Sequence, residues 1–321
     1  MHKKKAGRNK TIDFDIEQGR QYLDKCIQVD TPVKLTEILN KTIIGDSVKT
    51  AENIPNKSID LIIVDPPYNL NKSFHGNNFS KKNDEVYEEY TRIWLDKVIP
   101  LLKDDGSIYV CCDWQSSLII GKVLSERLII RNRITWQREK GRGAKANWKN
   151  SHEDIWFATV SDKYTFNLDD VMVRKKVLAP YRVDGKPKDW VESDDGNFRD
   201  TCPSNFWDDV TVPFWSMVEN TSHPTQKPEK LIAKLILASS NKGDTVLDPF
   251  LGSGTTSVTA KKLGRNYIGI EQNPVYCAWA EKRIEMADED DSIQGFHDGV
   301  FWERNTLEHQ KKLKKTRKKG R

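Results

Sequence analysis

Two strand–turn–helix units, far apart in the sequence, most restrict how this chain can fold. The first, "SIDLIIVDPPYNL" (58–70), joins an apolar run to a proline turn, and a helical pattern over residues 85–102 follows it. The second, "DTVLDPFLGSGTTSVTAKKLGRNYIGIE" (244–271), joins a short apolar strand to a glycine-rich loop, a helix and another strand. Strands that alternate with helices imply right-handed crossovers. The sequence therefore predicts an α/β fold with a doubly wound, mostly parallel sheet.

The stretch between the two units does not continue this alternation. Residues 133–160 resemble two strands around a basic polar loop, and residues 167–222 then lose the periodicity. The second stretch is rich in Pro, Gly, Asp and aromatic residues, which is typical of an inserted subdomain or a set of recognition loops. The acidic run at 288–291 is expected to mark the end of the globular part.

The positive charge of the chain is concentrated at its two ends. The 321 residues carry a formal net charge of +5, yet residues 1–10 hold five Lys and Arg and residues 311–321 hold eight, with no acidic residue in either stretch. Removing these thirteen positive charges from +5 leaves −8 for residues 11–310. Like charges repel, so both tails are predicted to be disordered. They either concentrate phosphate polyanions without reading sequence or act only as solubilising ends.

The cysteines and histidines indicate neither a disulfide framework nor a metal site. Five cysteines form an odd set without CxxC spacing, and the six histidines show no paired ligand spacing. This usage is typical of a reducing compartment. No run approaches the roughly 18 apolar residues of a membrane span, and no apolar segment follows the basic N-terminus. The sequence therefore predicts a cytoplasmic protein without a metal or a membrane partner.

The glycine-rich motif "DPFLGSGTT" (248–256) lies where an open α/β sheet binds ligands, at the carboxyl end of a strand. Gly252 and Gly254 allow backbone to approach a ligand, and Glu271 ends the next strand, where it can accept hydrogen bonds from a ribose diol. No GK[ST] follows, the spacing is not GxGxxG, and Asp248 disfavours a pyrophosphate. The loop alone is equally consistent with a plain β–α turn, but together with Glu271 it favours a nucleoside-type ligand.

The tetrapeptide Asp65-Pro66-Pro67-Tyr68 ends the first apolar strand. Proline fixes φ and stiffens the turn, so the Asp65 carboxylate and the Pro66 carbonyl can converge on one NH₂ donor. Tyr68 offers a flat face on which a planar ring can stack. The alternative is that the two prolines only terminate the strand. In a chain that also contains the glycine-rich unit, the tetrapeptide predicts a pocket for a flat heterocycle with an exocyclic amine.

Four motifs together carry a resemblance to a known family. "DPPY", "DPFLGSGTT", "HPTQKP" (223–228) and "LGRNYIGIE" (263–271) resemble the amino-methyltransferases that transfer a methyl group from S-adenosylmethionine to an exocyclic nitrogen of a DNA base. The match covers roughly residues 41–285, and "DPPY" precedes the glycine-rich loop, which is similar to the family's β order. The resemblance implies a Rossmann-like class I methyltransferase fold with a small inserted target-recognition region.

The resemblance also implies how the chain is divided and what it binds. Residues 1–40 form an N-terminal extension, 41–166 the catalytic half of the methyltransferase domain, 167–222 the target-recognition insert, 223–287 the cofactor-binding half, and 288–321 an acidic and then basic tail. The implied cofactor is S-adenosyl-L-methionine, and the implied partner is duplex DNA. A cognate restriction endonuclease and a second copy of the chain are further implied partners, in a bacterial or phage-encoded modification enzyme.

The resemblance assigns roles to matching positions of this sequence. The catalytic and base-binding residues are Asp65, Pro66, Pro67 and Tyr68. The cofactor-binding residues are Asp46, Thr225, Lys227, Asp248, Phe250, Gly252, Ser253, Gly254, Thr255 and Glu271, with His223 near the cofactor or target pocket. The candidate phosphate contacts of the basic loop are Arg142, Lys145 and Lys149. Alternatively, Asp46 is an ordinary turn residue or helix cap, and the basic loop is only a solvated surface.

The aromatic residues of the insert are expected to form its small core rather than to read bases. These residues are Trp190, Phe206, Trp207, Phe214 and Trp215.

The leading residue of the tetrapeptide indicates the target base. In the family, a leading Asp leans towards adenine N6 and a leading Ser towards cytosine N4, so Asp65 predicts adenine. Cytosine N4 remains the alternative because both bases present the same NH₂, and an RNA substrate also stays open. Protein-amide methylation is disfavoured because those enzymes begin the motif with Asn. Cytosine C5 methylation needs a nucleophilic cysteine, which follows a proline in the family with that chemistry. No cysteine here follows a proline, so this reaction is excluded. The intact motifs also disfavour a nucleic-acid binder without activity.

Overall fold

The computed structural model describes residues 7–69, 72–74, 77–79, 82–138, 146–177, 181–193 and 196–306. Its α-helices are α1 (Ile16–Leu23), α2 (Leu35–Ile38), α3 (Ser47–Ala51), α4 (Asp84–Val98), α5 (Trp114–Ser125), α6 (Glu229–Ser239), α7 (Thr255–Lys262) and α8 (Pro274–Glu289). The strands of its main sheet are β1 (Lys41–Ile44), β2 (Ile59–Val64), β5 (Leu102–Cys112), β6 (Ile129–Gln137), β7 (His152–Thr159), β13 (Phe206–Trp207), β14 (Thr245–Asp248) and β15 (Asn266–Glu271).

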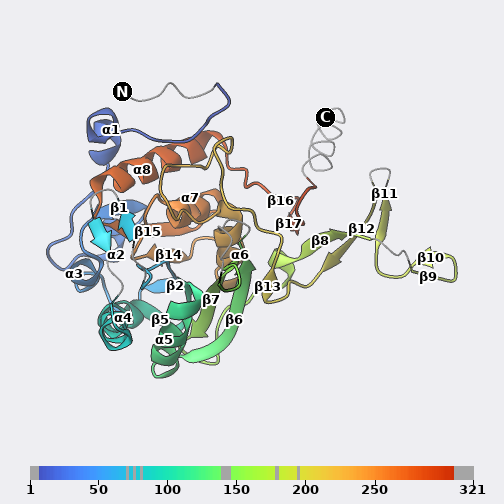
Figure 1. Cartoon of the computed structure of the whole chain (residues 1–321), viewed down its shortest axis with the longest axis horizontal. Coiled ribbons are helices and arrows are strands. Elements are labelled where there is room, and N and C mark those ends of the chain that lie inside the picture. The colour runs from blue at the N-terminus through green and yellow to red at the C-terminus, as the bar shows by residue number, and fades with distance from the viewer. Residues whose placement is uncertain are drawn as a thin grey trace.

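The main sheet has eight strands in the order β1-β15-β14-β2-β5-β7-β6-β13 (Figure 1). Neighbouring strands are parallel except around β7, which runs antiparallel to both β5 and β6. This mostly parallel sheet confirms the predicted α/β class. The order also makes β14 the direct neighbour of β2, so the two units that are far apart in the sequence end side by side.

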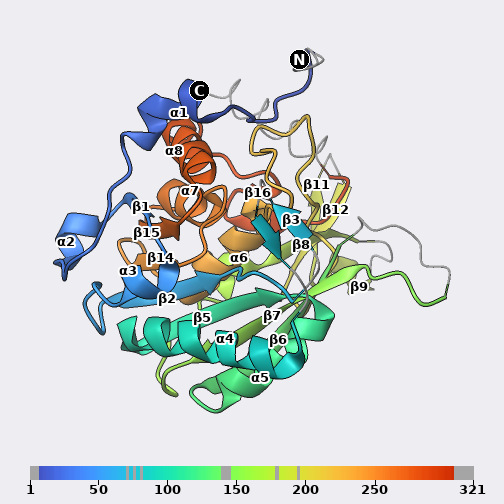
Figure 2. The ribbon, with the colours of Figure 1, turned by 60° about the vertical axis from the view of Figure 1, so that its left-hand side comes forward.

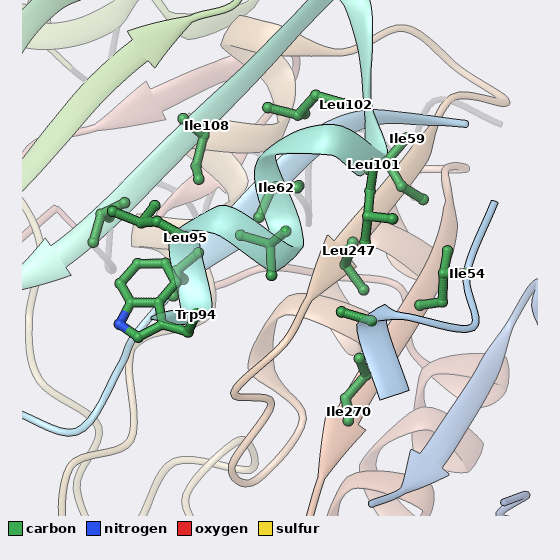
Figure 3. Close-up of a cluster of buried hydrophobic side chains, with 14 of the residues drawn as sticks. Ile54, Ile59, Ile62, Trp94, Leu95, Leu101, Leu102, Ile108, Leu247 and Ile270 are labelled. Carbon is green, nitrogen blue, oxygen red and sulfur yellow. The ribbon is translucent and has the colours of Figure 1, made fainter. Parts of the chain in front are cut away.

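The apolar run of β2 explains its central position. Ile62 and Val64 belong to the cluster under α4 and α5, whereas Leu61 and Ile63 belong to the cluster under α6 and α7. Figure 2 shows these helices on opposite faces of the sheet, and Figure 3 shows Ile62 among the side chains of the first cluster. A strand buried on both faces must be apolar throughout, and each such side chain contributes about 1.5–3 kcal/mol.

Helix α6 is buried along its whole length, including its charged residues. Lys230 and Lys234 both pair with Asp209, at 2.8 and 2.6 Å, and Glu229 pairs with Arg283 at 3.0 Å. Buried charges require such partners because water no longer solvates them. These pairs fasten α6 to the segment after β13 and to α8, and so fix the start of the helix beside the sheet.

The insert, together with the segment after α8, forms a second sheet, called here the insert sheet, that extends away from the main one (Figure 1). It has five strands in the order β11-β12-β8-β17-β16, formed by β8 (Val173–Lys176), β11 (Val191–Ser193), β12 (Gly196–Thr201), β16 (Phe296–His297) and β17 (Val300–Trp302). Two further hairpins pair β3 (Lys72–Phe74) with β4 (Asn77–Phe79) and β9 (Arg182–Val183) with β10 (Lys186–Pro187), and short 3₁₀ helices span Ile99–Leu101 and Asp169–Val171.

The expectation that the globular part ends at residues 288–291 is wrong. Strand β17 pairs in parallel with β8 of the insert, and Phe301 and Trp302 are almost fully buried. The reason is hydrophobic: in the short "VFW" segment after the acidic run, Phe301 packs against α6, and Trp302 meets Phe198 of β12 edge to face at 5.3 Å between ring centroids. The basic stretch 307–321 lies outside the described residues.

The aromatic residues expected to form the insert core divide into two groups. Trp190 and Trp207 are buried, whereas Phe206, Phe214 and Trp215 remain 38–53% exposed. The expectation is therefore wrong for these last three, and also for Trp207, which is buried in the main-domain cluster under α6 and α7. The reason is that the side chains from β8, β12 and β17 already fill the core of the insert sheet.

The N-terminal extension packs onto the domain instead of standing apart. Helix α1 lies along α8, and the indole of Trp279 donates a hydrogen bond to the Phe14 carbonyl at 3.0 Å. The Lys10 amide donates to the carbonyl of Trp215 at 2.8 Å, which joins the extension to the insert. Residues 1–6 lie outside the described part. In the part that the structure describes, no helix is long and apolar enough to cross a membrane.

The close approach of α7 and α8 yields a prediction about Gly254. Its φ is +86°, and a Cβ there would lie 2.5 Å from the Cβ of Ala280 and 2.7 Å from its Cα. Gly264 shares the left-handed backbone, with φ +73°, but has its nearest neighbour at 4.0 Å. Gly264→Ala should therefore lose about 1–3 kcal/mol of unfolding free energy for backbone strain alone. Gly254→Ala should lose about 1–3 kcal/mol more, because α8 must move.

Urea unfolding of both variants measures the difference. Equal losses would mean that the contact with α8 does not constrain Gly254.

Candidate active site

A cavity of about 340 Å³ opens at the carboxyl edge of β2, β14 and β15. Pockets for small molecules range from about 300 to 1,000 Å³. The predicted site residues that line this cavity are Asp46, Asp65, Pro66, Pro67, Tyr68, His223, Thr225, Lys227, Asp248, Phe250, Gly252, Ser253, Thr255 and Glu271. The fold thus gathers around one cavity residues from four segments that are far apart in the sequence.

The proline turn after β2 is held in place by polar contacts from outside it. The hydroxyl of Tyr87 in α4 donates to the Pro67 carbonyl at 3.2 Å. The side chain of Asn69 both donates to the Lys82 carbonyl at 3.0 Å and accepts from the Lys82 amide at 2.8 Å. Because prolines cannot donate backbone hydrogen bonds, these side-chain contacts replace the ladder that ends with β2. The turn is therefore rigid on both sides.

Both oxygens of the Asp65 carboxylate have partners. The Tyr68 hydroxyl donates to Oδ1 at 2.8 Å, and Lys227 Nζ donates to Oδ2 at 2.7 Å and to the Tyr68 oxygen at 3.0 Å. Burial, followed by the charge of Asp65, raises the pKa of Tyr68 well above its usual value, so its hydroxyl remains a donor. Lys227, predicted among the cofactor residues, thus lies against the catalytic turn.

A second carboxylate, which the sequence analysis missed, shares Lys227. Glu153 at the start of β7 is only 4% exposed; its Oε2 lies 3.2 Å from Lys227 Nζ and 3.3 Å from the Tyr68 hydroxyl, and its Oε1 pairs with Arg138. Burial by itself raises the pKa of Glu153, but Lys227 and Arg138 outweigh it and hold that pKa below its usual value. Glu153 is therefore an anion inside the protein.

The missed residue has a topological explanation. Because β7 is antiparallel to its neighbours, its first residues, and not its last, lie at the carboxyl edge of the sheet. An acid that begins an apolar strand, as in "HEDIWFATV" (152–160), is the signal that would have indicated this position.

At the end of β14, Asp248 organises the glycine-rich loop. Its Oδ2 accepts from the Thr256 hydroxyl at 2.6 Å, and its Oδ1 accepts from the Phe250 amide at 3.0 Å. Burial raises the pKa of Asp248 to about 7; these two hydrogen bonds oppose that effect, whereas the negative charges of Asp65 and Glu271 add to it. A cationic ligand in the cavity would favour its ionised form.

At the end of β15, Glu271 accepts backbone hydrogen bonds from the same loop. The Gly252 amide donates to Oε2 at 2.9 Å, and the Asn273 amide donates to Oε1 at 2.8 Å. Burial raises the pKa of Glu271, and these amides partly offset the increase. Each carboxylate oxygen can accept a further hydrogen bond, so Glu271 can still receive hydroxyl donors from a ligand.

The other side of the cavity combines a helix cap with an aromatic wall. Asp46 caps α3 by accepting from the amides of Val48 and Lys49 at 3.1 Å, and it also lines the cavity. Both interpretations of Asp46 therefore fit its position. The ring of Phe250 meets Trp94 edge to face, at 5.8 Å between ring centroids, so its orientation is fixed by the core.

One predicted cofactor residue, Gly254, does not line the cavity. Its Cα faces α8, and the space that its missing side chain leaves is filled by Ala280. Gly252, by contrast, has φ +56° and faces the cavity, where a Cβ would lie 3.2 Å from His223 Nε2. The missing side chain of Gly254 allows α7 to pack closely on α8, whereas the missing side chain of Gly252 leaves open space beside the loop.

The predicted DNA contacts are placed only in part. Arg142 and Lys145 lie outside the described residues, whereas Lys149 is exposed, next to Trp148, which is 93% exposed. Such a bare indole is available to stack on a base or pack on a sugar. Within the described ranges, no group of three or more His, Cys, Asp or Glu side chains is arranged to hold a metal ion.

Comparison with known proteins identifies the family of this chain. A family model described as DNA methylase matches residues 59–282. The type II methyltransferase M.HpaI of Haemophilus parainfluenzae is 37% identical over 248 residues, which cover 76% of this chain and 74% of the relative. The DNA adenine methyltransferase YhdJ of Escherichia coli K12 is 37% identical over 259 residues, which cover 77% of this chain and 83% of the relative.

Solved structures agree with the fold. The M1.HpyAVI–SAM complex is 26% identical, with a TM-score of 0.50, over 75% of this chain and 98% of that chain. The cytosine-N4-specific PvuII DNA methyltransferase is 20% identical, with a TM-score of 0.57, over 81% of this chain and 88% of that chain, and at this identity it supports the fold alone. The resemblance carried by the four motifs is thus confirmed: the chain belongs to the N6/N4 family of DNA methylases.

Proposed function

We propose that this protein transfers the methyl group of S-adenosyl-L-methionine to the N6 amine of adenine in duplex DNA. The observation that carries the proposal is that the amine acceptors and the cofactor residues share one cavity. Asp65 and Tyr68 lie at one end, and Asp248 and Glu271 lie at the end of the next strands. Transfer between two bound groups requires this shared space, because the reacting atoms must meet at about 3–3.5 Å.

The residues of the cavity fit this cofactor. Glu271 would receive the ribose hydroxyls, Asp46 and Phe250 would face the adenine, and the acids Asp248 and Asp65 suit a ligand with positive charge. The cavity has ordinary small-molecule size, and the absence of a Cβ at Gly252 leaves room beside the loop. When bound, S-adenosyl-L-methionine supplies a sulfonium methyl that a nucleophile can attack in line.

The amine is activated by the turn after β2. A target base must leave the duplex, at a cost of about a few kcal/mol, and stacking on Tyr68 would recover roughly 1–3 kcal/mol. The lone pair of the amine is delocalised into the ring. Hydrogen bonds from its N–H groups to Asp65 and the Pro66 carbonyl favour a pyramidal nitrogen with an available lone pair. Asp65 then accepts the proton that the nitrogen loses after transfer and releases it to water.

Adenine is favoured over cytosine by two observations. Asp65 leads the tetrapeptide, and the relative YhdJ, at 37% identity, is named a DNA adenine methyltransferase. The relatives named type II methyltransferases suggest a role in restriction-modification in the bacterial cytoplasm, beside a cognate endonuclease. A homodimer remains a prediction from the sequence.

The target base can be identified directly. DNA from a methylation-free strain, incubated with the protein and S-adenosyl-L-methionine and digested to nucleosides, should contain N6-methyladenine. N4-methylcytosine as the only product would overturn the choice of base. Labelling of structured RNA but not of duplex DNA would overturn the choice of substrate. Long-read sequencing of DNA from cells that express the chain then locates the methylated site.

Replacement of Asp65 tests its role in transfer. Asp65→Ala removes the carboxylate acceptor, so kcat should fall by about 10²–10⁴-fold, as for other lost acid–base or electrostatic groups. The Kd for S-adenosyl-L-methionine should change much less than kcat, because Asp248 and Glu271 remain. Asp104→Ala, which removes an exposed carboxylate paired with Lys57, serves as the control. Activity of Asp65→Ala within tenfold of the wild type would contradict the assignment.

The raised pKa of Asp248 predicts that cofactor binding depends on pH. In the free protein this carboxyl is protonated below pH about 7, and the stability that it contributes at low pH is lost as pH rises from about 4 to 7. A cationic ligand favours the ionised form, so the Kd should fall and the gain in Tm on binding should grow from pH 6 to pH 8.

Calorimetry and thermal unfolding at both pH values measure this effect. In Asp248→Asn the dependence should disappear, and the comparison subtracts any titration of the ligand itself. A pH dependence that is the same in both proteins would show that Asp248 does not cause it.

A further inference from the structure

Lys227 lies within reach of two carboxylates, Asp65 of the proline turn and Glu153 at the start of β7. Its Nζ is 2.7 Å from Asp65 Oδ2, 3.2 Å from Glu153 Oε2 and 3.0 Å from the Tyr68 oxygen. Its side chain is 6% exposed, and that of Glu153 is 5% exposed. A buried ammonium that can reach two anions has two positions in which its charge is compensated.

This arrangement bears on the step at which the target base arrives. In the structure, both Asp65 oxygens already accept hydrogen bonds, and Lys227 holds one of them. An incoming amine must displace Lys227 from that oxygen or share the oxygen with it. A buried cation that loses its only anionic partner is strongly destabilised, because water does not solvate it. Lys227 avoids this loss because Glu153 lies within reach.

Glu153 is itself held in place, as a partner for Lys227 must be. Its other oxygen pairs with Arg138, and the Arg138 amide donates to the Ser151 carbonyl at 2.6 Å. This contact closes the base of the segment between β6 and β7, where the sequence analysis placed the basic loop. The four charges of Asp65, Glu153, Lys227 and Arg138 balance, so Lys227 can move between the carboxylates without changing the net charge of the site.

We propose that Glu153 is a positioning residue for methyl transfer: it retains Lys227 while Asp65 exchanges this ammonium for the amine of the target base. The proposal rests on the proposed function, since it concerns the same turn. The Tyr68 hydroxyl contacts both carboxylates and the ammonium, so it keeps a polar partner whichever carboxylate Lys227 pairs with. Glu153 thus acts on Asp65 through Lys227 and does not touch the base.

Removal of the charge of Glu153 should have a specific consequence. In Glu153→Gln, Lys227 has Asp65 as its only anionic partner, so the amine competes with an ammonium for the same oxygen. The kcat at pH 7.5 should fall at least tenfold, while KM for S-adenosyl-L-methionine stays within about twofold. Glu153→Asp, which keeps the charge on a shorter side chain, should recover part of the loss.

The pH profile distinguishes this role from simple support of the fold. The ionisable groups facing Lys227 are Asp65, Tyr68, Cys111 and Glu153, with Arg138 behind Glu153. Burial opposes the charge of Lys227, while Asp65 and Glu153 raise its pKa. Loss of Glu153 lowers that pKa, so deprotonation of Lys227 should free Asp65 at high pH. The activity of Glu153→Gln should therefore rise more steeply from pH 7 to pH 10 than that of the wild type.

The experiment measures transfer of labelled methyl to methylation-free DNA across this pH range. Asp209→Asn is the matched control, since Asp209 is a comparably buried carboxylate with two lysine partners, Lys230 and Lys234, outside this cavity. It should lose stability without steepening the profile. A profile of Glu153→Gln parallel to that of the wild type, or a steepening equal to that of Asp209→Asn, overturns the proposal. A wild type that labels no DNA refutes the proposed function, and this inference with it.

Discussion

The ion pair between Lys227 and Asp65 joins two turns that are 162 residues apart in the chain. Asp65 ends β2, and Lys227 immediately precedes α6, whose apolar face covers Leu61 and Ile63 of the same strand. A fold that separated the two turns would leave the buried ammonium of Lys227 with Glu153 as its remaining anionic partner and would remove one of the two hydrogen bonds to Asp65. Packing of α6 on β2 and pairing of Lys227 with Asp65 therefore stabilise the same relative position of the two turns. The core and the candidate site thus depend on each other.

Charge is divided between the inside and the outside of the molecule. The cavity is mostly acidic, with Asp46, Asp65, Asp248 and Glu271 against the single ammonium of Lys227 among its described lining residues. Such a wall suits a cationic cofactor and an amine donor, and it repels the phosphates of a polyanion. In the sequence, residues 1–10 and 311–321 carry thirteen Lys and Arg and no acidic residue. If the proposed function holds, the acidic cavity admits a neutral base but disfavours the phosphates of the nucleic acid.

The sequence predicted the parts of the candidate site whose residues lie within a few positions of one another. It missed the residues that only the topology of the sheets brings into place. The proline turn and the glycine-rich loop each need fixed residues within a few positions, so their motifs are visible. Glu153 reaches the site only because β7 runs antiparallel, so the acid that begins this apolar strand becomes informative only once the direction of the strand is known. Likewise, "VFW" in β17 is too short to show that it pairs with β8. Gly254 looked like a ligand contact because a glycine that admits a helix is indistinguishable in sequence from one that admits a ligand.

Recognition of the amine and recognition of the base depend on different groups of the protein. In the proposed function, Asp65 and the Pro66 carbonyl would accept hydrogen bonds from an NH₂ group, which adenine and cytosine share, and Tyr68 would stack on any flat ring. The buried network behind them stabilises the acceptors but does not touch the ring. Selectivity between bases and between sites must therefore arise from groups around the cavity mouth and in the insert. The transfer centre can then stay fixed while the insert varies, since the main sheet and α6, and not the insert, hold the turn in place.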